Sequence, residues 1–421
     1  MQMAVRMPVD RRRRCDLAEI LAAGALVPSY QPLVDLESGE VVGYEALARW
    51  PGLGPVDPIS AFAEAQAQGR LADLDWACRL AALRGALDVS LGNEQTLFIN
   101  LTASSCVTSQ PPAVATLVDE AVHKLRVVLE LTENSLSRQP SELLRTIRWA
   151  RDRGWGIALD DVGVNPDSLA LLPFVAPDVI KLDLSLVQHS PQPQQARTIT
   201  AIMAHAERTG AVILAEGVET PAHLEQALAF GARYGQGWLF GRPGPLPAAA
   251  SAARLPFTKR PAQAPTTPFE LVRESRDLRV GRKKLLLAIS HEIERQAMTL
   301  GDPPVLLSAF ETADTFTPAT SQRYACLAVA CPFVGVLAAD LRPGRCPGVR
   351  DICLTAADPL VGEWVVTAVG PHYASALIAR DLVDAGPDGD RRFAFVITHD
   401  RETVVSAGRS LMARITDAAP T

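Results

Sequence analysis

Short apolar runs alternate with longer stretches of helical period over the first 245 residues of the chain. The longer stretches, such as 141–154 and 196–210, repeat apolar residues every three to four positions, as amphipathic helices do. The short runs have the composition and length of strands, and there are eight of them: 30–36, 41–50, 97–101, 127–133, 156–162, 179–183, 211–218 and 235–240. Eight strands with helical crossovers predict an α/β fold, a TIM-type (β/α)8 barrel. A doubly wound open sheet is the alternative.

Nearly every one of these runs ends in a charged or amide residue. In chain order these residues are Glu45, Asn100, Glu130, Asp160 with Asp161, Lys181 with Asp183, Glu216 and Gln236. The carboxyl ends of barrel strands open on one face, so these side chains are expected to converge there. Helix N-caps could account for two or three of them, but a ring of oxygen ligands around one lysine indicates a functional site.

Carboxylate and amide oxygens are the ligands of hard divalent cations, so the ring predicts Mg²⁺ or Mn²⁺. Asp160 and Asp161 are adjacent and would point to opposite faces of a regular strand. At a strand end the backbone turns, and both can then face the barrel mouth. Asp160 could therefore bridge two metal ions, the arrangement used for in-line attack on a phosphodiester.

Proline divides the chain. Seven prolines lie between residues 243 and 268, and proline fixes φ and removes a hydrogen-bond donor. The sequence therefore predicts a leader over 1–24, a barrel over 25–245, a Pro/Ala-rich linker over 246–267 and a smaller domain over 268–415. A semi-rigid linker of this kind makes direct fusion of the two cores unexpected.

The smaller domain has an α+β pattern. An amphipathic helix is expected over 278–298 and a second helix over 373–382. The strand-like runs are 305–310, 324–339, 363–370 and 391–400.

Bulk properties limit the partners. The chain has 421 residues, is 48% hydrophobic and carries a net charge of −6, so no global basic field attracts DNA. Its seven cysteines are odd in number and scattered, which fits a reducing compartment. No apolar signal segment opens the chain, and the longest apolar stretch, 326–339, is interrupted by Pro332. A cytoplasmic protein without membrane insertion is expected.

The strand-end motifs resemble those of the EAL-domain cyclic-di-GMP phosphodiesterases, hydrolases of bacterial second-messenger signal transduction. "YEALARW" resembles the E-x-L-x-R motif that names the family, and six further motifs follow in the family's order: "FINL", "LELTE", "LDDVG", "IKLD", "AEGVET" and "YGQGWLFGRP". The resemblance covers about residues 28–245. It implies a TIM-type barrel with one strand reversed, hydrolysis of cyclic di-GMP to linear pGpG, and a homodimer formed through this domain.

The resemblance also assigns roles to single residues. The residues implied to bind two Mg²⁺ or Mn²⁺ ions are Glu45, Asn100, Glu130, Asp160 and Asp161. The residues implied to act in catalysis are Lys181 and Gln236 at the attacking water, Glu216 as base or metal ligand, and Glu219 as holder of the loop after Asp161. The residues implied to contact the substrate are Gln31, Leu47, Arg49 and Gln236, with the Arg49 guanidinium on a phosphate.

One loop departs from the family pattern. The family has D-D-F-G-T-G where this chain has Asp160-Asp161-Val162-Gly163-Val164-Asn165. The loss of an aromatic anchor and a hydroxyl is expected to loosen the loop, and a misplacement of about 1 Å can cost about 10²-fold in rate. The alternative to a regulated phosphodiesterase is therefore a catalytically weak or silent cyclic-di-GMP receptor. A third reading is an interaction module that binds no nucleotide.

The stretch 358–382 resembles the DICT sensory domain, found beside cyclic-dinucleotide and two-component proteins. The resemblance extends over about 268–415 and implies control of the barrel by a signal that the sequence does not identify.

Overall fold

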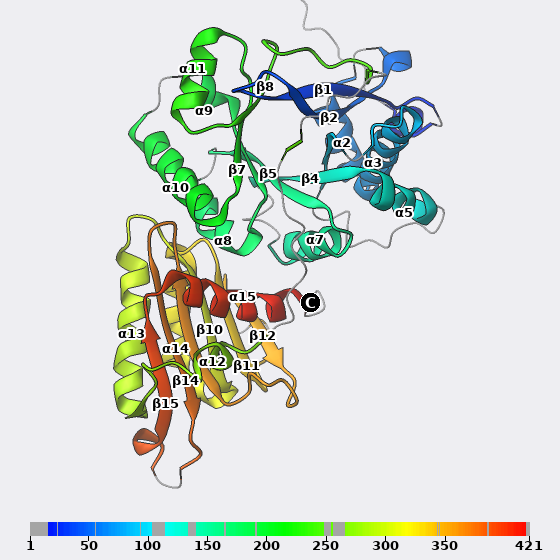
Figure 1. Ribbon diagram of the computed structural model, residues 1–421. Coiled ribbons are helices and arrows are strands. Elements are labelled where there is room, and N and C mark those ends of the chain that lie inside the picture. Colours follow the sequence, from blue (N-terminus) through cyan, green and yellow to red (C-terminus); the bar gives the residue numbers. More distant parts are fainter. Residues whose placement is uncertain are drawn as a thin grey trace, which may run out of the picture.

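The computed structural model describes residues 16–417, except 23, 55, 93, 103–113, 134–139, 164–165, 190–191, 248–253, 256–265, 343, 345 and 385–386. The described chain forms a closed barrel followed by an open sheet covered by helices (Figure 1).

The barrel has eight strands, as the apolar runs predict: β1 (Val27–Asp35), β2 (Val41–Arg49), β3 (Thr96–Asn100), β4 (Arg126–Thr132), β5 (Gly156–Val162), β6 (Val179–Leu182), β7 (Val212–Ala215) and β8 (Tyr234–Gln236). They pair in chain order and close into a barrel. β1 runs antiparallel to both neighbours, β2 and β8, whereas the other pairs are parallel. The barrel with one reversed strand is therefore confirmed.

Helices and short 3-10 turns connect the strands: η1 (Pro51–Leu53), α2 (Pro58–Ala67), α3 (Leu71–Asp88), α5 (Ala115–Lys124), α7 (Pro140–Asp152), η3 (Pro166–Leu171), α8 (Leu172–Val175), α9 (Leu184–Gln188), α10 (Pro193–Thr209) and α11 (Pro221–Ala229). Local sequence sets their ends. α10 begins with Pro193 in its first turn and ends at Gly210, which adopts φ +73°. Proline suits the first turn because its missing N–H is not needed there, and glycine takes the left-handed cap without strain.

An extra helix precedes the barrel. α1 (Leu17–Ile20) buries Leu17 and Ile20 against Trp50, whose indole N–H donates to the carbonyl of Ile20 over 3.1 Å. The described end of the predicted leader is thus packed onto the barrel, while residues 1–15 lie outside the described residues.

The second domain is built on a seven-stranded sheet with the order β12-β11-β10-β13-β14-β15-β9. Its strands are β9 (Arg279–Arg282), β10 (Val305–Thr312), β11 (Val334–Ala339), β12 (Arg350–Leu354), β13 (Glu363–Val369), β14 (Ala374–Asp381) and β15 (Arg392–Thr398). Its helices are α12 (Pro268–Val272), α13 (Lys283–Thr299), α14 (Pro318–Ala330) and α15 (Arg401–Asp417), with 3-10 turns η4 (Ala313–Thr315) and η5 (Asp388–Asp390). α13 and α14 pack on one face of the sheet, and α12 and α15 pack on the other.

Three sequence predictions for this domain are wrong. The expected helix over 373–382 is β14, a strand that lies between β13 and β15. Helices cover both faces of the sheet, so β14 is apolar on both sides and lacks the alternation that identifies a strand. The first part of the run 324–339 belongs to α14, and residues 279–282 form the edge strand β9 instead of helix.

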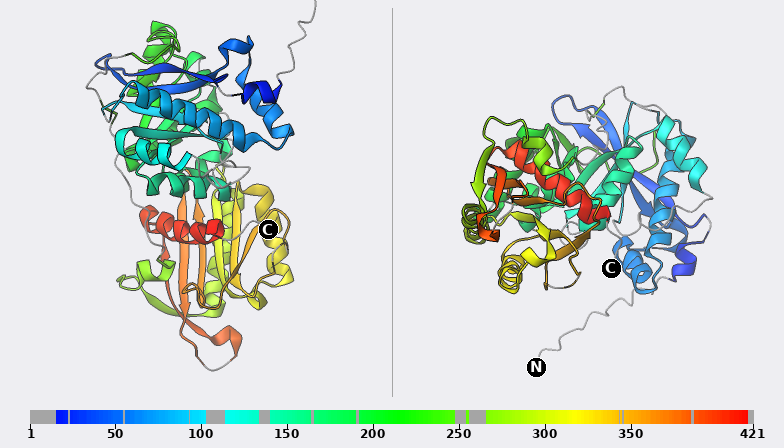
Figure 2. Two further views of the ribbon diagram at one scale, coloured as in Figure 1. Left: turned by 90° about the vertical axis from the view of Figure 1, so that its right-hand side faces the viewer. Right: turned by 90° about the horizontal axis from the view of Figure 1, so that it is seen from below.

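The two domains share a core, contrary to the expectation from the linker. α15 packs against α7 and α8 of the barrel (Figure 2). Arg409 donates from Nε and Nη2 to the carbonyl of Pro173 over 2.9 and 2.7 Å. Arg197 of α10 binds Asp302 at 2.5 Å, and apolar residues of α15, such as Leu411, belong to the same hydrophobic cluster as Phe174 of α8.

One residue of the predicted linker is also a core residue. Leu255 is fully buried and packs inside the barrel with Phe98, Val128 and Leu214. Its carbonyl accepts a hydrogen bond from Arg126 Nη2 at 2.8 Å. Most other residues between 248 and 265 lie outside the described part of the chain.

No helix in the described parts of the chain combines the length and the low polarity required for a membrane span.

Candidate active site

The strand-end residues form one layer inside the barrel. Directly below it lies an apolar layer that includes Phe98, Val128, Ala158, Val179, Leu214 and Tyr234. Side chains alternate along a strand, so the residue two positions further on faces the interior as well. The positions reached in this way are Asn100, Glu130, Asp160, Lys181, Glu216 and Gln236, and on the reversed strand Leu33 is followed in space by Gln31. This layer, together with Glu45, is called the carboxylate ring below.

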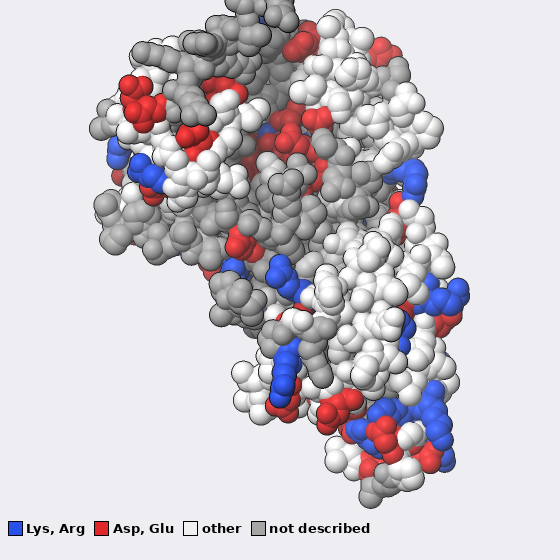
Figure 3. Space-filling model, turned by 180° about the vertical axis from the view of Figure 1, so that it is seen from behind, with Lys and Arg blue, Asp and Glu red and all other residues white. Residues whose placement is uncertain are grey.

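Lys181 lies at the centre of the carboxylate ring and is fully buried. Its Nζ is 2.7 Å from Glu130 Oε1, 2.7 Å from Glu216 Oε1, 3.1 Å from Asp160 Oδ1 and 3.7 Å from Glu45 Oε2. One cation therefore faces four carboxylates, and the site as a whole is strongly acidic. Figure 3 shows acidic side chains gathered in a hollow of the barrel.

Glu45 is fixed by two amides. Asn100 Nδ2 donates to Glu45 Oε1 and Gln236 Nε2 donates to Glu45 Oε2, each over 2.7 Å. Gln236 Nε2 also lies 3.2 Å from Gln31 Oε1, and Gln31 Nε2 donates to the carbonyl of Gly241. The amide side chains thus tie the reversed strand β1 to the ring.

Asp160 and Asp161 both face the mouth, as expected from their place at the end of a strand. Asp161 adopts φ +56°, which turns the backbone at this point, and its N–H donates to Asp160 Oδ1 over 3.0 Å. Carboxylate oxygens of Asp160, Asp161 and Glu216 all lie within 4.8 Å of one another. A left-handed φ is uncommon for a residue other than glycine, so the surrounding structure must stabilise it.

The ring shifts the pKa values of its members in different directions. Burial raises the pKa of Glu130 well above its usual range, and the nearby Glu45 adds to the effect. Burial also raises the pKa of Glu216 to about 8, although Lys181 opposes this. For Glu45 the burial effect is outweighed by Lys181 and by the two amide hydrogen bonds, so its pKa is lowered. Burial disfavours the charge of Lys181, but the carboxylates led by Asp160 raise its pKa well above the usual value. Lys181 therefore keeps its proton.

The ring fits divalent cations by its donor set. All its candidate ligands are oxygen atoms, which suit Mg²⁺ or Mn²⁺. Glu130 Oε2 is buried and accepts no hydrogen bond from a described residue, and such an oxygen is costly unless a cation or a donor meets it. Asp160 belongs both to this set and to the group with Asp161 and Glu216, so it is placed to serve two ions.

The predicted substrate residues continue from the ring toward the rim. Glu45, Leu47 and Arg49 alternate along β2 and so share one face of the strand, and Gln31 lies opposite Glu45 in the β1–β2 register. Leu47 and Arg49 are half-buried, and Arg49 Nη1 donates to the carbonyl of Ala48 over 2.8 Å. Arg49 is the last residue of β2, so it lies on the same face as Glu45 and beyond Leu47.

Among the described residues, Glu133 contacts the start of the loop after Asp161, and it was not predicted from the sequence. The N–H of Gly163 donates to Glu133 Oε2 over 3.3 Å, and the hydroxyl of Ser168 donates to Glu133 Oε1. Glu219, expected in this role, is exposed, and its backbone N–H contacts His223 Nδ1. Its role in holding the loop stays a prediction, because residues 164–165 lie outside the described residues. The second glutamate of "LELTE", three residues after Glu130, was the available signal.

The altered loop is only partly described. Val162 is fully buried and pairs with Leu182 in the sheet, so valine fills this position without exposing the start of the loop. Val164 and Asn165 lie outside the described residues. Asp183 accepts a hydrogen bond from the N–H of Ser185 and caps α9. It is therefore one of the strand-end residues that serve as a helix N-cap.

The fold and the ring define a class of proteins, and comparison with known families identifies it. The model of the EAL domain matches residues 14–243, more than half of the chain. The chain therefore belongs to the EAL family. A second family model, described as a sensory domain in diguanylate cyclases and two-component systems, matches residues 270–382, so the chain also contains a DICT domain.

Curated relatives match through part of their length. Cyclic di-GMP phosphodiesterase NbdA of Pseudomonas aeruginosa is 32% identical over 259 residues, which are 59% of this chain and 32% of that protein. The uncharacterized protein y4lL of Sinorhizobium fredii is 32% identical over 254 residues, 58% of this chain and 30% of that protein. The chain thus spans about a third of the length of these relatives.

Solved structures match over about half of the chain. The complex of Klebsiella pneumoniae BlrP1 with manganese and cyclic di-GMP is 29% identical, covers 53% of this chain and 57% of that chain, and gives a TM-score of 0.47. The complex of PaMucR phosphodiesterase with cyclic di-GMP is 29% identical, covers 55% of this chain and 96% of that chain, and gives a TM-score of 0.48.

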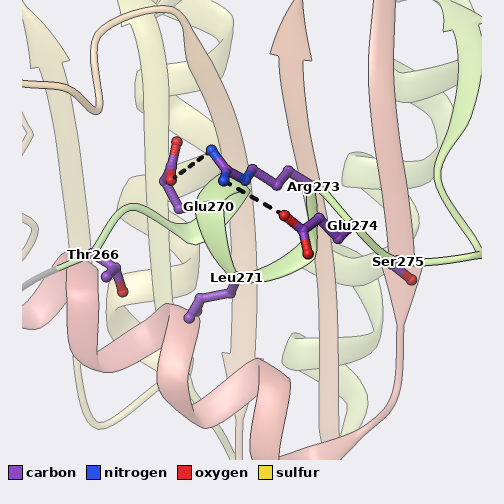
Figure 4. Close-up of a pocket in the computed structure, with 6 residues that line it drawn as sticks. All are labelled: Thr266, Glu270, Leu271, Arg273, Glu274 and Ser275. Carbon is purple, nitrogen blue, oxygen red and sulfur yellow. Dashed lines mark hydrogen bonds and ion pairs between the residues drawn. The ribbon is translucent and has the colours of Figure 1, made fainter.

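The second domain has a separate surface hollow beside α12. It has a volume of about 480 Å³ and is lined by Thr266, Glu270, Leu271, Arg273, Glu274 and Ser275 (Figure 4). Arg273 pairs with Glu270 at 3.4 Å and with Glu274 at 3.5 Å. Because its one arginine is already paired with both glutamates, this hollow does not display a binding group comparable with the carboxylate ring.

Proposed function

We propose that this protein hydrolyses cyclic di-GMP to linear pGpG with divalent metal ions, and that its DICT domain regulates the reaction. The observation that supports this best is the buried carboxylate ring around Lys181. Membership of the EAL family, and similarity to a relative named as a cyclic di-GMP phosphodiesterase, point to the same chemistry.

The ligands of the first Mg²⁺ or Mn²⁺ ion would be Glu45, Asn100, Glu130 and Asp160, and those of the second would be Asp160 and Asp161. Two such ions would lower the pKa of a bound water and would place positive charge beside the phosphodiester. They would also offset the repulsion between the acidic ring and a dianionic nucleotide.

The chain's own residues would orient and deprotonate the water. Lys181 retains its proton because four carboxylates surround it, so its Nζ would hold the water in place by donating a hydrogen bond. Glu216, whose carboxylate lies 2.7 Å from Lys181 Nζ, would receive a proton from that water at a carboxylate oxygen, as a general base does. The Gln236 amide would fix Glu45 and contact the substrate.

The direct test is incubation of the purified full-length protein with Mn²⁺ and cyclic di-GMP, followed by chromatography for pGpG. Product formation that stops in EDTA supports the proposal. Tight binding of cyclic di-GMP without any pGpG would instead establish a receptor, and undiminished turnover in EDTA would rule out the metal mechanism.

Arg49→Ala is expected to weaken nucleotide binding about 10-fold, with a smaller effect on kcat. The guanidinium follows Glu45 and Leu47 along one face of β2, where it can bind a phosphate of the substrate through charge-assisted hydrogen bonds. Isothermal titration with Ca²⁺ in place of Mn²⁺ measures the affinity. Arg84→Ala, on the outer helix α3, is the control, and equal affinities for Arg49→Ala and wild type would exclude the phosphate contact.

Regulation by the DICT domain is supported by the position of α15. It packs on α8, and α8 directly follows η3, which carries Ser168, the hydroxyl partner of Glu133. Glu133 also holds Gly163, two residues after Asp161. A displacement of α15 would therefore reach the loop that positions Asp161.

Gly408→Leu tests this connection in the full-length chain. A Cβ at Gly408 would lie 3.1 Å from the ring of Phe174, so leucine should push α15 away from α8 while favouring the helix itself. We expect kcat to fall about 3- to 10-fold with unchanged nucleotide affinity, because a shift of about 1 Å is enough for such an effect. Glu402→Leu, exposed in the first turn of α15, is the control. A kcat equal to that of wild type would argue against regulation through this contact.

A further inference from the structure

A buried ion pair lies on α3, outside the carboxylate ring. Asp75 and Arg79 are each 2% exposed, and Arg79 Nη2 is 2.7 Å from Asp75 Oδ2. The guanidinium also stacks on Trp76, with its carbon 3.7 Å from the ring centroid. Both charges are therefore removed from water and fixed in orientation.

The other oxygen of Asp75 contacts the chain next to the ring. The N–H of Thr102 donates to Asp75 Oδ1 over 2.9 Å. Thr102 follows Asn100 by two residues, and the N–H of the intervening Leu101 donates to the carbonyl of Glu130 over 3.0 Å. The backbone that leaves Asn100 thus donates one hydrogen bond to the neighbouring strand and one to Asp75.

Stability alone does not explain this arrangement. Removing two charges from water is costly, and apolar residues of similar volume often stabilise a core equally well or better. An apolar pair, however, offers no acceptor for the N–H of Thr102. The distinctive contribution of Asp75 is therefore an acceptor at a fixed point beside Asn100.

We propose that Asp75 is a positioning residue for metal binding, which acts by holding the backbone after Asn100 so that the Asn100 side chain stays in the carboxylate ring. This inference rests on the proposed function, because it assigns Asn100 to the metal site. Outer partners that orient ligands typically change metal affinity about 10- to 100-fold when they are removed.

Two double variants of the full-length protein separate positioning from packing. Asp75→Asn/Arg79→Met and Asp75→Leu/Arg79→Met both lack the ion pair, but only the first retains an acceptor for the N–H of Thr102. We expect the asparagine variant to bind Mn²⁺ within about 2-fold of wild type and the leucine variant to bind it about 10-fold more weakly. Isothermal titration with Mn²⁺ gives the affinities, and thermal melting in EDTA verifies that both variants are folded.

The same comparison in an Asn100→Ala background tests whether Asp75 acts through Asn100. The two double variants should then bind Mn²⁺ equally, because the ligand that Asp75 positions has been removed. Glu294→Gln, which breaks a buried ion pair with Arg323 in the DICT domain, should leave Mn²⁺ affinity unchanged.

Equal Mn²⁺ affinity of the asparagine and leucine variants would overturn the proposal, and so would a difference between them that persists without Asn100. These outcomes are read from metal binding alone. Absence of pGpG in the presence of bound Mn²⁺ would instead count against the proposed hydrolysis, so the two failures are distinguishable.

Discussion

Asp160→Ala is expected to lower the rate of cyclic di-GMP hydrolysis by at least about 10³-fold, a barrier increase of about 4 kcal/mol. In the proposed assignment Asp160 is the ligand shared by both metal ions, and it lies 3.1 Å from Lys181 Nζ and within 4.8 Å of oxygens of Asp161 and Glu216. Its removal would impair both metal positions at once. Single-turnover kinetics with saturating Mn²⁺, followed by chromatography for pGpG, measures the effect.

The fold of this variant should remain intact. Asp160 is one of four carboxylates around a single lysine, so its loss removes one ion pair but also relieves repulsion among the carboxylates of the metal-free ring. The melting temperature in EDTA should therefore stay close to that of wild type or rise. Asp119→Ala, on the exposed side of α5, is the matched control with full activity. Turnover by Asp160→Ala within 10-fold of wild type would contradict the assignment of a bridging ligand.

Lys181→Met is expected to lower the melting temperature of the metal-free protein by roughly 10 °C. Methionine has a similar length but no charge, so the variant leaves Glu130, Glu216, Asp160 and Glu45 without their common cation. Breaking a buried ion pair from one side costs about 3–5 kcal/mol, and each kcal/mol shifts the melting temperature of a domain of this size by about 2–4 °C. Thermal melting in EDTA is the measurement. The control is Lys284→Met, which replaces an exposed lysine of α13, and its melting temperature should equal that of wild type.

The deficit of Lys181→Met should grow with pH. Glu130 and Glu216 have raised pKa values in the folded protein, and that of Glu216 is about 8. Between the unfolded pKa of about 4.5 and that value, the folded state binds protons that the unfolded state has released, so stability falls as pH rises. Lys181 also lowers the pKa of Glu45, so without the lysine this buried carboxyl would hold a proton in the folded state as well, and the slope becomes steeper. Melting curves at pH 5 and pH 8 measure this, and saturating Mn²⁺ should restore most of the stability lost at pH 8. A deficit of equal size at both pH values would contradict the coupling of Lys181 to these carboxylates.

The barrel could be predicted because its strands carry two separate signals. The apolar runs give the strands, and the polar residue at the end of each run gives the interior layer, two positions after an apolar residue such as Val128 or Val179. Glu133 was not predicted. The motif "LELTE" contains two glutamates, Glu130 and Glu133, and the sequence alone does not show which one faces the ring and which one reaches the loop. β14 was mistaken for a helix since both of its faces are buried. The contact of α15 with α8 depends on residues more than 200 positions apart, and no local pattern encodes it.

The burial of Leu255 inside the barrel changes how the two domains are tethered. The proline-rich stretch spans more than twenty residues. Because Leu255 is anchored in the barrel, only ten residues separate it from Thr266, which directly precedes Thr267, the N-cap of α12. A short tether gives the surfaces of α15 and α8 an effective concentration, one toward the other, of roughly millimolar. The contact between α15 and α8 can then form most of the time even if its intrinsic affinity is weak. A signal that weakens docking by about 1.4 kcal/mol would change the docked-to-undocked ratio tenfold, so under the proposed regulation a modest event in the DICT domain would be enough to act on the barrel.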